Sequence, residues 1–240
     1  MTRQRLAAAF AYFSIFPVGG EAAGPADARL FAYLPVVGFL IGGLAGTAAF
    51  GVSLIAPRSL SVATGFALSI LLTGAIHVDG FLDCCDGLIA SVPPQRRLEI
   101  IRDPHHGSFA IAYGAVAFTL WIAAIAALPP ARLGMVLAFA AATSRVAAVS
   151  SGLFFPYARG GRPPVWLLLL QSLALIGFSF VGGPWMWACV PAAFLTSWAG
   201  AAWSARRLDG QLVGDVYGAL IVVSEILVLL LVATLLHVGV

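Results

Sequence analysis

Five carboxylates gather in one short polar stretch of a chain that is otherwise strongly apolar. The stretch runs from His77 to Gly107 and holds five of the ten acidic residues. Three of them, Asp79, Asp83 and Asp86, are spaced i, i+4, i+7, which places all three on one face of a helix. Carboxylates this close repel one another, and a cation that they share removes the repulsion. The spacing therefore predicts a carboxylate metal site.

The rest of this stretch suits a phosphate bound through magnesium. Mg²⁺ prefers oxygen ligands and is commonly held by one or two carboxylates together with substrate phosphates. Gly80 and Gly87 lack side chains beside the acids, where a phosphate would approach. Arg96 and Arg102 follow, and guanidinium groups bind phosphate well. We therefore expect phosphoryl or nucleotidyl transfer, with the three spaced aspartates as Mg²⁺ ligands.

The composition places the chain in a lipid bilayer. The chain is 61% hydrophobic and 10% charged, and its mean hydropathy is +0.99. Such values lie outside the range of soluble domains, and the apolar runs are long enough to cross a membrane several times. We expect an all-α, polytopic helical bundle that forms a single membrane domain over residues 1–240. An interfacial helix over 6–18 precedes about seven spans, at residues 31–55, 61–76, 109–128, 133–153, 165–181, 185–203 and 216–236.

The arginines predict which way the bundle faces. All 13 basic residues are arginine, and with a cytoplasmic N-terminus only Arg58 and Arg132 fall outside, while Arg145 lies in a span. This distribution agrees with the positive-inside rule. Polar loops at 78–108, 154–164 and 204–215 then open on the cytoplasmic face. The net charge of +3 does not indicate binding to nucleic acid.

Two charged residues inside the expected spans need partners. Arg145 costs about 2.5–3.5 kcal/mol in a membrane, so we expect an acidic or phosphate partner unless the side chain reaches the interface. Glu225 lies near the middle of the last span and is costly unless it faces a polar cavity or Arg145. Either a functional site or a structural pair explains Glu225.

The order of the motifs resembles that of the cobalamin synthase family, the adenosylcobinamide-GDP ribazoletransferases. The similar elements are HVDGFLDCCDGL at 77–88, RRLEIIRDPHHG at 96–107, FPYARGG at 155–161 and GQLVGDVYGA at 210–219. The likeness covers nearly the whole chain. It implies an Mg²⁺-dependent enzyme of the bacterial inner membrane that joins adenosylcobinamide-GDP to α-ribazole, or to its 5′-phosphate, and releases GMP. Association into a homo-oligomer is left open.

The resemblance also implies roles for single residues. Arg96, Arg102 or Arg159 would neutralise charge on the transferred phosphoryl group. Either Asp103 or Asp215 would act as the general base for the ribazole hydroxyl. His77 matches the family motif, and we expect it to orient Asp79 rather than to bind the metal. The family usually has other polar residues at positions 105 and 106, so His105 and His106 receive no role.

Two other functions compete with this interpretation. A CDP-alcohol phosphotransferase also uses a D-x-x-D-G element, but residues 88–91 lack the arginine of that family, and its second pair of acids is missing downstream. An ion-coupled transporter would use Arg145 and Glu225, but the chain shows no internal repeat of the kind common in such transporters. A purely structural subunit leaves the acidic helix face unexplained.

Overall fold

The fold is built from helices alone throughout the part of the chain that the structure describes. This computed structural model describes residues 2–18, 27–155, 157, 161–183, 186–210 and 212–239. The α-helices are α1 (Thr2–Phe13), α2 (Ala28–Phe31), α3 (Leu34–Ser53), α4 (Arg58–Leu71), α5 (Ile76–Ile89), α6 (Pro94–Ile101), α7 (Ser108–Ala127), α8 (Leu133–Ser150), α9 (Val165–Gly182), α10 (Met186–Arg207) and α11 (Gly214–His237), and two short 3₁₀ turns flank α8. The all-α fold class expected from the sequence is confirmed.

The helices support a multi-pass membrane protein, although not a count of seven spans. Among the described residues, four helical segments are long and apolar enough to cross a bilayer: α3, α7, α11 and the stretch Pro130–Leu153 that contains α8. Helices α4 and α5 make a fifth if they form one bent span. The apolar part of α9, Val165–Phe180, is shorter, and α10 contains Pro191. The expectation of seven spans is therefore not confirmed.

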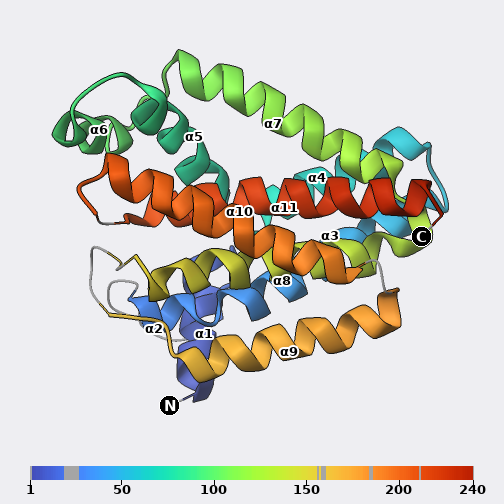
Figure 1. Ribbon diagram of the computed structural model, residues 1–240. Helices are drawn as coiled ribbons and strands as arrows, with labels where there is room; N and C mark the ends of the chain where they lie inside the picture. Colours follow the sequence, from blue (N-terminus) through green and yellow to red (C-terminus); the bar gives the residue numbers. More distant parts are fainter. Residues whose placement is uncertain are drawn as a thin grey trace.

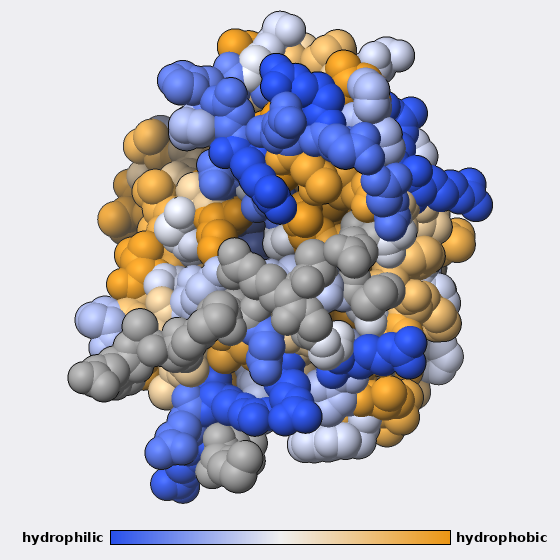
Figure 2. Space-filling view, turned by 90° about the vertical axis from the view of Figure 1, so that its left-hand side faces the viewer, coloured by the Kyte–Doolittle hydropathy of each residue, from blue (hydrophilic) through white to orange (hydrophobic). Residues whose placement is uncertain are grey.

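The connections that carry polar residues meet at one end of the bundle. In Figure 1, α3, α7, α9 and α11 begin at the left-hand end, whereas α8 and α10 end there. Helices α5 and α6 lie at the same end. Figure 2 looks onto this end and shows hydrophilic residues gathered on it. Segments that lie far apart in the sequence are thus brought to one polar surface.

Helix α8 is the centre of the bundle. All its residues from Val136 to Ser150 are buried. Helix α3 packs along it, and a methyl group added at Gly42 or Gly46 would overlap the backbone carbonyls of Leu137 and Leu133. Small residues on α3 thus let the two backbones approach closely, as they commonly do between membrane helices.

The second expected span does not continue straight into the acidic helix. Helix α4 ends at Leu71, and α5 begins at Ile76 after a bend of 81°. Gly74 adopts a left-handed conformation with φ of 61°, and the amides of Gly74 and Ala75 donate to the carbonyls of Leu71 and Ile70. This pattern is a Schellman motif, which ends a helix at a glycine. The break frees α5 to take a direction different from that of α4.

Candidate active site and metal centre

The crossing of α5 and α11 sets the position of the acidic helix. A Cβ atom at Gly80 on α5 would lie 2.8 Å from the Cα atom of Asp215, at the start of α11. A Cβ atom at Gly218 on α11 would lie 3.0 Å from the carbonyl oxygen of His77. The two glycines allow these helices to touch through their backbones. Asp215 is thereby placed beside the acidic face of α5.

Gly80→Ala is expected to destabilise the protein, because the added methyl group would force α5 and α11 apart. Overpacking of this kind costs about 1–3 kcal/mol. The measurement is the melting temperature of the detergent-solubilised protein. Gly51→Ala is the matched control, because a methyl group there meets nothing within 4 Å. Equal melting temperatures for the two variants would contradict the close contact between the helices.

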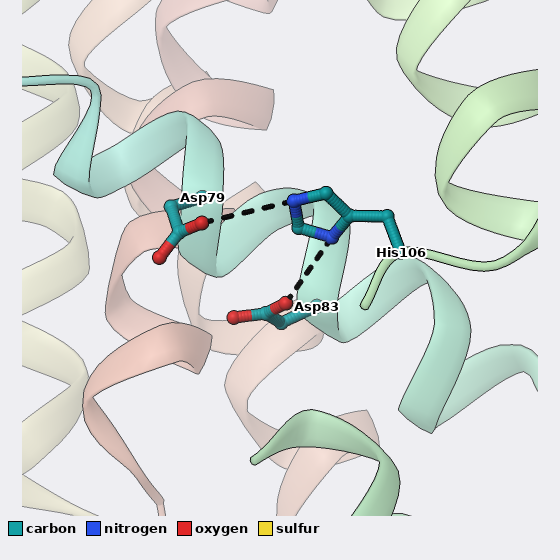
Figure 3. A group of neighbouring side chains, drawn as sticks. All are labelled: Asp79, Asp83 and His106. Carbon is teal, nitrogen blue, oxygen red and sulfur yellow. Dashed lines mark ion pairs between the residues drawn. The ribbon is translucent and has the colours of Figure 1, made fainter. Parts of the chain in front are cut away.

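Two aspartates of α5 and one histidine form a cluster of metal-binding size. The ligand atoms of Asp79, Asp83 and His106 all lie within 4.8 Å of one another. The Nδ1 atom of His106 is 3.4 Å from Oδ1 of Asp83, and Nε2 is 3.8 Å from Oδ1 of Asp79. Figure 3 shows the two ring nitrogens pointing toward the two carboxylates. The side chain of Asp79 is 65% exposed and that of Asp83 is 14% exposed, so the cluster can be reached from outside.

No role was predicted for His106 from the sequence. The residue does not share the i, i+4, i+7 spacing of the aspartates, since it lies in the connection before α7. Its only signal in the sequence was its place between Asp103 and Gly107, in a segment already rich in acids. The contact arises from the tertiary fold.

Asp86, the third aspartate of the face, holds the start of α7. It is buried, and its carboxylate accepts hydrogen bonds from the amides of Gly107 at 2.6 Å and Ala110 at 3.1 Å. A carboxylate suits the positive end of a helix, where free amides need acceptors. These bonds anchor the connection that carries His106 to α5. Asp86 is thus engaged on both oxygens, and its predicted role as a metal ligand stays a prediction.

Asp215 lines a cavity next to this cluster. The cavity has a volume of about 370 Å³, and its lining residues include Tyr12, Leu98, Ile101, Arg102, Tyr157 and Asp215. Residues 157 and 212 pair as an isolated parallel bridge, which joins the connection after α8 to the one before α11. The backbone of Asp215 lies against Gly80, the residue after Asp79, and its charge is among those that act on Asp83. Asp215 therefore lies close to the aspartate cluster and also lines the cavity.

Asp103, the other candidate base, lies in an exposed position. Its carboxylate accepts hydrogen bonds from the backbone amide of His105 at 3.0 Å and from the imidazole of His105 at 2.8 Å. These hydrogen bonds, from the backbone and then from the side chain, lower the pKa of the Asp103 carboxyl. A lower pKa makes Asp103 a weaker proton acceptor. Of the two candidate bases, Asp215 is the one near Asp83.

The arginines near α5 have different surroundings. Arg96 forms an exposed ion pair with Glu99, with 2.6 Å between Nη1 and Oε2. Arg97 is buried and donates to the carbonyls of Gly87 and Leu88, and Arg207 also donates to Leu88. These two cations satisfy the end of α5. Arg102 lines the cavity. Arg159 lies outside the described residues, and its role stays a prediction.

Other residues of the protein occupy the space beside Gly80 and Gly87 of α5. Gly80 lies against the backbone of Asp215, and a Cβ atom at Gly87 would overlap the side chain of Ile101 and lie 3.0 Å from the carbonyl oxygen of Arg97. Their positions are explained by helix packing, not by an open approach for phosphate.

Arg145 and Glu225 form an ion pair inside the bundle. The Nη1 atom of Arg145 lies 2.8 Å from Oε2 of Glu225, and the two side chains are 4% and 5% exposed. From the sequence, we predicted an acidic or a phosphate partner for Arg145. The structure supplies Glu225, so no phosphate is needed to explain a buried arginine here.

The surroundings of His77 do not match the role that we expected for it. Its ring stacks on Phe13 with 6.3 Å between ring centroids, and its Nε2 atom is buried without a hydrogen-bond partner among the described residues. Arg145 is a charged neighbour of the ring. The structure records no hydrogen bond from His77 to Asp79 in the described part of the chain, so an orienting role for His77 finds no support in the geometry.

The donor set fits a magnesium ion that is shared with a phosphate. Asp79 and Asp83 offer hard carboxylate oxygens close together and within reach of solvent, as Mg²⁺ sites require. Asp215 adds a third carboxylate nearby. An imidazole is a less usual ligand for Mg²⁺, so His106 fits better as a hydrogen-bond partner of the two aspartates. Asp79 and Asp83 are the residues that would hold the ion.

Comparison with known proteins identifies the family of this chain. The model of the cobalamin-5-phosphate synthase family matches residues 5–233. The adenosylcobinamide-GDP ribazoletransferase of Deinococcus radiodurans is 37% identical over 227 residues, which are 85% of this chain and 76% of the relative. That of Ralstonia pickettii is 32% identical over 241 residues, which are 94% and 93% of the two chains. No solved structure matches the chain significantly. Since the match spans almost the whole sequence, the chain belongs to the cobalamin-5-phosphate synthase family.

Proposed function

We propose that this protein joins adenosylcobinamide-GDP to α-ribazole, or to its 5′-phosphate, with Mg²⁺ as cofactor, and releases GMP. The names of the relatives give the substrates. The observation that carries the proposal for this chain is the position of Asp215, which lies against the helix of the Asp79–Asp83 pair and lines a cavity. A site for a diphosphate and a site for an alcohol are thus adjacent.

The residues present can carry out the transfer. Asp79 and Asp83 would bind the ion, and the ion would supply positive charge to the diphosphate and to the departing GMP. Asp215 would accept the proton of a ribose hydroxyl while that oxygen bonds to the phosphorus next to cobinamide. The bond from this phosphorus to the bridging oxygen breaks, and GMP leaves with the electron pair. Arg159 is our candidate for balancing charge on the transferred phosphoryl group.

The same arrangement indicates where the reaction takes place. The described parts of the three polar loops lie at one end of the bundle (Figure 1). The distribution of arginine predicts that this end faces the cytoplasm, where nucleotide substrates are made. We propose that the enzyme acts at the cytoplasmic face of the bacterial inner membrane.

Turnover by the purified protein tests this proposal. The detergent-solubilised protein is given adenosylcobinamide-GDP and α-ribazole, and the GMP and the corrinoid product are measured together. We expect the two products in equal amounts. Removal of Mg²⁺ should lower the rate by about 10²-fold or more, because a metal ion contributes several kcal/mol to stabilising the charge that develops.

The result also separates the alternatives. If folded protein forms neither product but releases CMP from a CDP-alcohol, the function is that of a CDP-alcohol phosphotransferase. Equal turnover with and without a metal chelator would remove Mg²⁺ from the proposal and leave the transfer reaction in place.

A further inference from the structure

The cavity beside Asp215 has the size of a nucleoside, not of a corrinoid. Its volume of about 370 Å³ lies at the lower end of the range for small-molecule sites. A corrin ring with its side chains requires far more space. The cavity therefore suits one of the two smaller groups in the reaction, which are the guanosine end of the donor and the ribazole acceptor.

The lining of the cavity favours the acceptor. Leu98 and Ile101 of α6 supply an apolar wall on one side, and Tyr12 of α1 adds an aromatic ring, while the polar side chains of Arg102 and Asp215 line other parts of the cavity. The base of α-ribazole is a dimethylbenzimidazole, which is flat and apolar and offers a single nitrogen as a hydrogen-bond acceptor. Guanine has several donors and acceptors, and those that faced Leu98 and Ile101 would be buried without partners, which is costly. An apolar wall thus fits the benzimidazole better.

The position of Asp215 supports the same assignment. This residue lines the cavity, and its backbone lies against Gly80, on the helix that carries Asp79 and Asp83. A general base must reach the hydroxyl whose proton it accepts. The alcohol that reacts therefore belongs in the cavity, while the diphosphate of the donor belongs on the Asp79–Asp83 side.

Among the described residues that line the cavity, Arg102 is the one cation. Its guanidinium has no hydrogen bond or ion pair with another residue in the described part of the chain, unlike Arg96, which pairs with Glu99. A free guanidinium in a substrate cavity is a ready binding group for a phosphate monoester. The acceptor carries such a group when it is phosphorylated at its 5′ position.

We propose that the cavity lined by Tyr12, Leu98, Ile101, Arg102 and Asp215 is the acceptor site and that Arg102 recognises the 5′-phosphate of α-ribazole 5′-phosphate. The inference rests on the proposed function. It makes Arg102 a residue that determines specificity between two acceptors, and it assigns this arginine to the acceptor instead of to the transferred phosphoryl group.

The test is the ratio of kcat/KM for α-ribazole 5′-phosphate to kcat/KM for α-ribazole. In Arg102→Ala we expect this ratio to fall by about 10–100-fold, which corresponds to a lost hydrogen bond to a charged group. The loss should appear mainly as a higher KM for the phosphorylated acceptor. Arg102→Lys keeps the positive charge and should recover part of the ratio.

Arg206→Ala is the matched control, because this exposed arginine at the end of α10 does not line the cavity. Its ratio should equal that of the wild type. If Arg102→Ala lowers kcat/KM for both acceptors by the same factor, Arg102 serves the donor or the fold, and the inference is wrong. A folded wild type that turns over neither acceptor would instead refute the proposed function, and the inference with it.

Discussion

Asp83→Asn is expected to lower turnover by at least about 10³-fold while the protein remains folded. Asp83 and Asp79 are the carboxylates that would hold Mg²⁺, and the amide of asparagine is neutral and a much poorer ligand for this ion. Removal of one hydrogen-bond donor that stabilises a transition state commonly costs about 10²–10³-fold, and loss of the ion removes a larger contribution. The assay is release of GMP from adenosylcobinamide-GDP in the presence of α-ribazole.

Folding and metal binding are measured on the same sample. The elution profile of Asp83→Asn should match that of the wild type, and its melting temperature should be no lower, because asparagine has the same size and removes repulsion among the carboxylates. Binding of Mn²⁺, followed by electron paramagnetic resonance as a substitute for Mg²⁺, should be weaker. Asp209→Asn is the control, since Asp209 is exposed and has φ of 53°, a conformation that asparagine tolerates. An active Asp83→Asn enzyme would remove Asp83 from the metal site.

The spacing of the aspartates predicted that they share one helix face, but it did not predict the role of each carboxylate. The i, i+4, i+7 pattern is local, so it can be seen in the sequence. Asp86 binds amides at Gly107 and Ala110, which are 21 and 24 residues away. Whether an acid faces a metal or the start of another helix depends on where that helix packs. The sequence therefore identified the acidic face without showing that Asp86 also accepts hydrogen bonds from the start of another helix.

Long-range contacts explain the other differences. His106 joins Asp79 and Asp83 only because the connection before α7 folds back over α5. The bend between α4 and α5 depends on a left-handed conformation at Gly74, and a glycine within an apolar run is also compatible with a continuous helix. The pairing of Arg145 with Glu225 was easier to anticipate. Two opposite charges in apolar spans have few other partners.

Breaking that ion pair is expected to have the largest effect on stability. Arg145→Met leaves the carboxylate of Glu225 buried without its partner, and Glu225→Met does the same to the guanidinium. Removing one member of a buried pair typically costs about 3–5 kcal/mol. We expect each single variant to show a much lower melting temperature and a smaller yield of folded protein, measured by size-exclusion chromatography in detergent.

The double variant distinguishes a structural role of Arg145 from a phosphate-binding role. Replacing both residues by methionine removes both buried charges, and such exchanges are often neutral or stabilising. The double variant should therefore regain most of the lost stability, with a strong coupling between the two sites. It should also regain turnover if the pair only joins α8 to α11. A stable double variant without turnover would instead return Arg145 to the phosphate-binding role that the sequence first suggested, since a structural pair predicts recovery of both properties.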